Sequence, residues 1–145
     1  MKRPIFSLMT AMFALPAQAE THDVYGLWLT EARDGLVEVS DCGDGTPCGA
    51  LVWADPDKTV SDYDVRNKEV PLQNRHLIGA PTIWGFERSE KGWKGGQIYN
   101  PEDGKTFRAS VKRQDADRLK VKGCLGPLCI SNTWMRIPAV LEVQP

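Results

Sequence analysis

The sequence predicts an all-β domain, an eight-stranded up-and-down antiparallel barrel with one long connector between its third and fourth strands. Short segments rich in β-branched and aromatic residues recur along the chain, and turn residues separate them. The 13 glycines and 10 prolines favour a chain of hairpins over a helical protein. Eight short strands joined mostly by hairpins fit a barrel. A two-sheet sandwich is the alternative.

Alternation and turn chemistry place the individual strands. They are predicted at residues 24–30, 36–40, 49–53, 82–87, 93–99, 105–112, 118–124 and 128–137. Turn residues lie between them, most clearly at 33–35, 100–104 and 126–127. Because consecutive strands of a meander run in opposite directions, their connectors alternate between two ends. We call the end where the first strand begins the floor, and the opposite end the mouth.

The connector of residues 54–81 stands apart from the hairpin turns. It contains Pro56, Pro71 and Pro81 and charges of both signs, with room for one short helix around residues 65–76. Long connectors inside a compact domain are usually functional or mobile. We expect this segment to lie at the mouth as a lid.

Residues 1–19 have the three parts of a secretory signal peptide. Lys2 and Arg3 form a basic start, an apolar stretch follows at 5–15, and the small-x-small site at 17–19 ends in Ala19. The apolar stretch is too short to cross a membrane. We therefore predict cleavage near Ala19 and a periplasmic or secreted protein. A buried N-terminal helix is the alternative.

The mature chain, residues 20–145, has the length of a single domain. Removal of Lys2 and Arg3 leaves 16 basic and 19 acidic residues, a net charge of −3. That balance does not favour nucleic acid or an anionic lipid as a partner. The sequence contains no later segment of sufficient length for a transmembrane helix, and it does not indicate an oligomeric state.

Four cysteines in an exported chain indicate disulfides. Cys42 and Cys48 bracket one predicted turn, Cys124 and Cys129 bracket another, and the two turns lie at opposite ends of the predicted barrel. A disulfide requires Cα atoms within about 7 Å of each other. We expect the pairs Cys42–Cys48 and Cys124–Cys129. A zinc site of four thiolates is the alternative, although its usual spacing is missing.

A structural lock is predicted where the first and last strands meet. In a closed barrel, Trp28 of the first strand lies beside Arg136 of the last, so that the guanidinium packs on the indole face. Gly26, two residues before the tryptophan, leaves room for this close approach. The lock belongs to the floor.

Catalytic motifs are absent from the sequence. It contains no G-x-S-x-G, no H-E-x-x-H and no glycine-rich phosphate loop. Its two histidines are His22 and His76, so a catalytic triad would depend on His76. We predict no enzyme activity, no metal and no cofactor. A solvated acidic loop is a better interpretation than a cation site for the connector pairs Asp55/Asp57 and Asp62/Asp64.

Aromatic side chains at the mouth are the candidate ligand contacts. Trp53, Trp84 and Tyr99 lie near the mouth ends of their strands, and the interior of an eight-stranded barrel is wide enough to be packed or to hold one small ligand. Apolar pockets carry a few polar groups. Core packing is the alternative role of the rings. The polar candidates are Asn100, Arg75 and His76.

Several motifs resemble a known family. The mature chain is similar to small exported bacterial proteins that form a domain-of-unknown-function family with a lipocalin-like (calycin) barrel. The resemblance implies that fold, export, and binding of a small, apolar molecule, and it brings no catalytic residues. It rests on Gly26-Leu27-Trp28, Cys42-Gly43, Cys48-Gly49, Asn67, Arg75-His76-Leu77-Ile78-Gly79 and the run G-G-x-I-Y-x-P-x-x-G-K-T at 95–106.

The sequence thus predicts an exported protein that binds a small hydrophobic or amphipathic ligand under the 54–81 connector. Trp53, Trp84 and Tyr99 would supply apolar contact and Arg75 a polar one. The alternative is a structural or interaction protein of the cell envelope with a filled barrel, in which the connector is a docking surface. Whether the barrel is hollow decides between the two.

Overall fold

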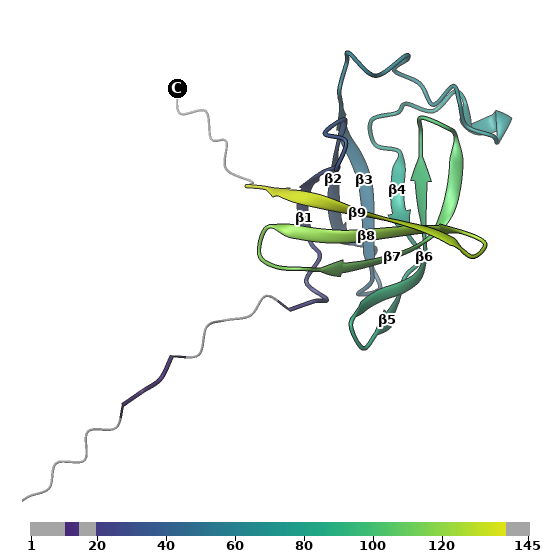
Figure 1. Cartoon of the computed structure of the whole chain (residues 1–145). Helices are drawn as coiled ribbons and strands as arrows, with labels where there is room; N and C mark the ends of the chain where they lie inside the picture. The colour runs from purple at the N-terminus through teal and green to yellow at the C-terminus, as the bar shows by residue number, and fades with distance from the viewer. Residues whose placement is uncertain (1–10, 15–19, 139–145) are drawn as a thin grey trace, which may run out of the picture.

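A computed structural model describes residues 11–14 and 20–138 (Figure 1). Of the predicted signal peptide it describes 11–14, which form no helix or strand. The elements are β1 (Gly26–Leu29), β2 (Gly35–Asp41), β3 (Pro47–Ala54), the 3-10 helix η1 (Val70–Leu72), β4 (Pro81–Trp84), β5 (Glu87–Ser89), β6 (Gly92–Asn100), β7 (Lys105–Arg113), β8 (Arg118–Leu125) and β9 (Leu128–Ile137).

All of these strands pair antiparallel in one sheet that closes on itself. The order is β4-β3-β2-β1-β9-β8-β7-β6, and a further pairing of β4 with β6 completes the circle. β4 and β5 both pair with β6, one after the other along it. Together they therefore occupy the position of one of the eight barrel strands. The predicted eight-stranded antiparallel barrel is therefore confirmed.

The predicted strand 82–87 is broken into β4 and β5 at residues 85–86. Opposite the break, the register of β6 shifts between Trp93 and Gly96. A Cβ atom at Gly96 would lie 2.3 Å from the ring of Phe86, so the phenylalanine covers a site that tolerates no side chain. The glycine pair at 95–96 thus bends β6 and seats Phe86 in the core.

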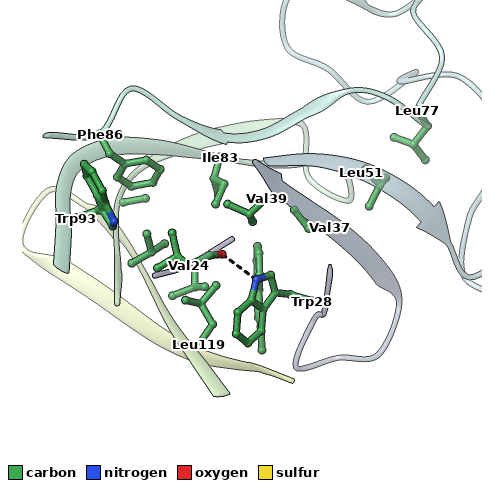
Figure 2. Close-up of a cluster of buried hydrophobic side chains, with 14 residues drawn as sticks. Val24, Trp28, Val37, Val39, Leu51, Leu77, Ile83, Phe86, Trp93 and Leu119 are labelled. Atoms are coloured by element: carbon green, nitrogen blue, oxygen red, sulfur yellow. Dashed lines mark hydrogen bonds between the residues drawn. The ribbon is translucent and has the colours of Figure 1, made fainter. Parts of the chain in front are cut away.

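The floor half of the barrel is filled by large side chains (Figure 2). Trp28, Ile83 and Leu119 are fully buried, and Phe86 and Trp93 are nearly so. The indole N–H of Trp28 donates to the carbonyl of Val24, 3.0 Å away, which satisfies the polar atom that burial would leave without water. The segment before β1 thereby joins the core.

Trp28 and Arg136 are directly paired across β1 and β9, the arrangement that the sequence predicts. The guanidinium carbon of Arg136 lies 5.8 Å from the indole centroid, and a Cβ at Gly26 would come within 3.5 Å of its nitrogen. Arg113 lies 6.0 Å from the same ring and forms an ion pair with Asp23. The floor is thus closed by two arginines, of which the sequence analysis identified one.

The cysteine pairs form as predicted. Cys42 bonds to Cys48 and Cys124 to Cys129, with Cα separations of 5.1 and 4.1 Å. The first pair closes the β2–β3 turn at the floor and the second closes the β8–β9 hairpin at the mouth. Within the described residues, no helix has the length and apolar character needed to cross a bilayer.

The connector between β3 and β4 crosses the mouth without a long helix. The predicted helix around 65–76 is reduced to the short helix η1. Pro71 lies in the middle of that range, where its ring and its missing N–H interrupt an α-helix, and Gly79 and Pro81 follow soon after it. Tyr63 and His76 form an isolated antiparallel bridge, which folds the connector back on itself. The segment is a hairpin-like flap.

Candidate functional site

A cavity of about 680 Å³ opens at the mouth of the barrel. Its walls come from β2, β3, β4 and β6 to β9, and the connector covers part of the opening. Apolar side chains form most of the wall, among them Val37, Leu51, Ile98, Phe107, Val121, Ile130 and Trp134. The volume lies within the range of small-molecule sites, roughly 300–1,000 Å³.

Small residues keep the mouth half hollow. Gly35, Ala54, Ala80 and Gly123 line the cavity. A Cβ atom at Gly123 would meet Ile98 at 3.5 Å, an ordinary contact distance, so a methyl group fits there without displacing its neighbours. The strands that fill the floor with indole and phenyl rings leave a pocket at the mouth because the residues change in size.

Carboxylates are more numerous than cations at the rim. Glu31 accepts the backbone N–H of Thr133, and Asp34 accepts the hydroxyl of Thr30 at 2.6 Å. The lining also includes Glu102 and Asp103 from the β6–β7 turn. Two cations share this rim: the ammonium of Lys58 donates to the carbonyl of Ala32, and the guanidinium of Arg66 donates to the carbonyl of Glu102. The polar groups thus lie around an apolar interior.

Asn132 is a polar side chain on the cavity wall itself. It pairs with the buried Val121 of β8, between Ile130 and Trp134 of its own strand, so its amide faces inward. It is half-buried. An amide offers both a donor and an acceptor, and here it can orient a ligand within an apolar wall.

A buried carboxylate clamps the connector to the barrel. Asp64 is 1 % exposed and accepts three hydrogen bonds, from the hydroxyl of Tyr99 and, at 2.9 Å each, from Arg75 and Asn67. The guanidinium of Arg75 also lies over the Tyr99 ring, 5.2 Å from its centroid. These three hydrogen bonds compensate the buried carboxylate for its lost hydration. Asp64 therefore holds the connector against β6.

The electrostatics of Tyr99 follow from this clamp. Burial raises the pKa of its hydroxyl above the ordinary value, and the bond to the Asp64 carboxylate raises that pKa further. The nearby Arg75 acts in the opposite direction and is the smaller influence. The hydroxyl therefore keeps its proton and remains a donor to Asp64 at physiological pH.

A close backbone approach reinforces the clamp at the β6–β7 turn. Gly104 has a φ of 68°, and a Cβ built on it would lie 1.7 Å from the carbonyl oxygen of Arg66. The amide of Lys68 donates to the carbonyl of Gly104 at 3.3 Å. Both the positive φ and the close approach of the Arg66 carbonyl require glycine at position 104. The 95–106 motif and the 75–79 motif thus meet in the clamp, through Tyr99 and Arg75, which both donate to Asp64.

Trp53 faces away from the cavity. Leu36 pairs with Trp53 and Val37 pairs with Leu51, so Val52 is an extra residue in β3. Such a bulge reverses which face the following residues occupy. Val37 and Leu51 point into the core, whereas Trp53 lies on the outer surface with 39 % of its area exposed.

The structure separates the other predicted ligand contacts. Tyr99 and Asn100 line the cavity. Trp84 pairs with Gln97 next to the inward pair Ile83–Ile98, which puts it on the outer face. Arg75 is bound to Asp64, and His76 is exposed and stacks on Tyr63 with ring centroids 4.8 Å apart.

Sequence reasoning missed Asn132, Ile130 and Trp134 as cavity residues. Their signal is the period-two alternation of the last strand, in which every second residue from 128 to 134 faces inward. In the described part of the chain, His, Cys, Asp and Glu side chains do not gather in groups of three that would hold a metal ion. The aspartates of the connector differ in burial: Asp64 is buried in the clamp, while Asp57 and Asp62 are exposed.

The closed eight-stranded barrel has a lipocalin-like fold. A solved structure of protein HP1028 from the human pathogen Helicobacter pylori, described as belonging to the lipocalin family, matches with a TM-score of 0.69 at 23 % identity. The match covers 82 % of this chain and 86 % of that one. The chain belongs to the DUF2147 family of uncharacterized proteins conserved in bacteria, whose model matches residues 26–136. A comparison with curated proteins finds no match.

Proposed function

We propose that this protein binds one small hydrophobic or amphipathic molecule in the mouth cavity. The observation that carries the proposal is an apolar cavity of about 680 Å³ above a filled floor. Apolar area removed from water contributes roughly 25 cal/mol per Å² to binding before the costs of association. A molecule with an apolar body gains from this wall, and its polar end meets Asn132 or the rim.

The connector supports this proposal as a cover for the ligand. Leu77 and Ala80 contribute to the lining from the segment after Asp64, which the ion pair of Asp64 with Arg75 holds in place. Lys58, Thr59 and Val60 contribute from the segment before Asp64. We expect this earlier segment to move when a ligand enters, because the clamp binds the connector at Asp64, Asn67 and Arg75.

A filled barrel that acts only through its surface is the weaker candidate, because the mouth half is hollow. That the protein is not an enzyme stays a prediction. Export also stays a proposal, supported by the two cysteine pairs. Amino-terminal sequencing of the protein from a periplasmic or culture fraction tests it, with Glu20 as the expected first residue.

Titration with the neutral fluorescent probe N-phenyl-1-naphthylamine, beside native mass spectrometry of the purified protein, tests ligand binding. The expected result is saturable binding of one probe per protein. Gly123→Leu adds a side chain to the cavity wall at a position where a Cβ atom makes ordinary contacts, and should weaken binding at least tenfold.

The matched control is Ser131→Leu, which adds the same side chain to the exposed outer face of the neighbouring strand. Its affinity should equal that of the wild type. Absence of saturable binding, together with a bare native mass, would reject the proposal. Equal weakening by both variants would place the probe outside the cavity.

A further inference from the structure

The opening of the mouth cavity is bordered by exposed apolar side chains. Four residues line the cavity although each is 46–66 % exposed: Val60, Tyr63 and Val65 of the connector, and Ile130 of β9. A ligand that lay wholly inside the cavity would leave these side chains in contact with water. Large apolar side chains gathered in water usually mark a contact surface, and here they surround the way out of the cavity.

The β8–β9 hairpin continues this apolar wall past the rim. Leu125 pairs with Leu128 at its end, and Gly123 pairs with Ile130 behind them. Side chains alternate between the two faces of a strand, so both leucines share the inner face with Gly123 and Ile130, which line the cavity. The leucines are 63 and 69 % exposed, and the hairpin turn protrudes on the right of Figure 1. The inner face of the hairpin is thus an extension of the cavity wall.

Gly123 connects the cavity to the leucine pair. It follows the buried Val121 and precedes Leu125 on the inner face of β8. A Cβ atom built on it would lie 3.5 Å from Ile98 and 3.8 Å from Phe107, two other lining residues. Because glycine has no side chain, the wall is low at the point where the cavity meets the hairpin.

The disulfide of the hairpin keeps its inner face in place. Cys124 and Cys129 are paired directly behind the Leu125–Leu128 pair and bonded to each other. They alternate with the inward residues, so the bond lies on the outer face and leaves the inner face free. A covalently closed hairpin loses little conformational freedom when a ligand contacts it, which favours binding.

The inner face of β9 is long enough to distinguish between ligand shapes. Trp134, Asn132, Ile130 and Leu128 face inward in succession from the buried end to the exposed end. At a rise of about 3.3 Å per residue, they span about 20 Å. A compact molecule cannot contact Trp134 and Leu128 together, whereas an extended hydrocarbon chain can.

We propose that the ligand is an elongated amphiphile with a single hydrocarbon chain, which fills the cavity and continues along the inner face of the hairpin. This inference rests on the proposed function and names the class of molecule that the cavity takes. The methyl end lies toward Trp134, and the polar end leaves the mouth beside Leu128. A chain that emerges from the cavity contacts apolar side chains of both the connector and the hairpin, and removing this surface from water stabilises the complex.

Displacement of N-phenyl-1-naphthylamine by lysophosphatidylcholines tests the inference on the full mature protein. This series keeps one headgroup without net charge while the chain length varies, and the octanoyl, dodecanoyl and hexadecanoyl forms are compared below their micelle-forming concentrations. Each methylene removed from water strengthens binding roughly fourfold. The affinity should therefore rise from octanoyl to dodecanoyl, and again by at least ~10-fold from dodecanoyl to hexadecanoyl, since only the longest chain reaches the leucines.

The double variant Leu125→Ser with Leu128→Ser removes the apolar surface outside the mouth at two exposed positions. It should lower the affinity for the hexadecanoyl form ~10-fold and leave that for the dodecanoyl form unchanged. The matched control is Val70→Ser with Ile78→Ser, which changes two exposed apolar residues of the connector that do not line the cavity. Its affinities for both forms should equal those of the wild type.

Four results would contradict the inference, and they differ in what they leave standing. Equal wild-type affinities for the dodecanoyl and hexadecanoyl forms would overturn it while the cavity remained a ligand site. Equal losses for both forms in the leucine variant would mean that the hairpin affects the whole cavity. A dimer in sedimentation velocity that the leucine variant abolishes would assign the leucines to a second copy of the chain. Failure of the probe and all three lipids to bind would reject the proposed function itself.

Discussion

The two halves of the barrel are built from the same strands and differ in what holds them together. At the floor, Trp28, Phe86 and Trp93 fill the interior, and Arg113 and Arg136 close it. At the mouth, small residues leave a cavity, and a polar clamp on the outer wall keeps the connector in place. The floor is stabilised by packing, and the mouth is stabilised by hydrogen bonds.

This division explains how a domain of this size can have a hollow interior. Nine of the 14 buried residues in the hydrophobic cluster do not line the cavity, so their packing needs no ligand. Removing large side chains from the mouth costs stability, and the Asp64 clamp offsets part of that cost by ordering the connector. Stability and binding are thus assigned to opposite ends of one sheet, so that each can be tested by substitution at its own end.

The largest expected difference comes from removing one aromatic ring at each end. Trp28→Ala should lower the free energy of unfolding by about 3–5 kcal/mol, because it leaves a void in a dry core. Phe107→Ala should cost about 1 kcal/mol, because its half-buried ring already borders open space. Urea unfolding of both variants measures the two effects.

The contrast between floor and mouth would be contradicted if Trp28→Ala and Phe107→Ala lowered the free energy of unfolding by the same amount. Equal losses would mean that the mouth is packed in solution as tightly as the floor. Probe binding distinguishes the variants further, since Phe107→Ala should change the affinity of the cavity while Trp28→Ala, where it remains folded, should change it little.

The clamp is the next test. Asp64→Asn should lower the free energy of unfolding by about 2 kcal/mol, since the amide oxygen replaces a carboxylate that serves three donors and leaves Arg75, 27 % exposed, without its counter-charge. The exposed Asp62→Asn is the control and should change stability by less than about 0.5 kcal/mol.

Limited proteolysis should then cut the Asp64→Asn connector faster than that of the wild type, within residues 55–80. A connector that stays resistant while global stability falls would contradict the clamp. That result would mean that Asp64 supports the barrel wall alone and does not order the flap.

The barrel was predictable because its signals are local or depend on closure. Alternation, turn residues, cysteine spacing and the pairing of Trp28 with Arg136 all follow from chain order. The site was less predictable, for two physical reasons. One inserted residue, Val52, turns Trp53 outward, and no pattern in the sequence marks it. Arg75 and Tyr99 are predicted ligand contacts, and the sequence does not show that both also bind Asp64, a contact between distant segments that only the folded connector creates.

The smallest expected effect concerns the hydroxyl of Tyr99, which donates to Asp64 in the clamp. Tyr99→Phe should cost about 1 kcal/mol near neutral pH, the usual value of one hydrogen bond. The pKa of Tyr99 is raised in the folded protein above the unfolded value near 10, so its contribution to stability is complete below pH 10 and decreases as the pH rises above it. Urea midpoints of wild type and variant should therefore converge between pH 9 and about pH 11. Tyr25, whose pKa is also raised, is present in both proteins and cancels. A difference that stays constant over this range would show that folding does not raise the pKa of the Tyr99 hydroxyl, and would contradict both its burial and its bond to Asp64.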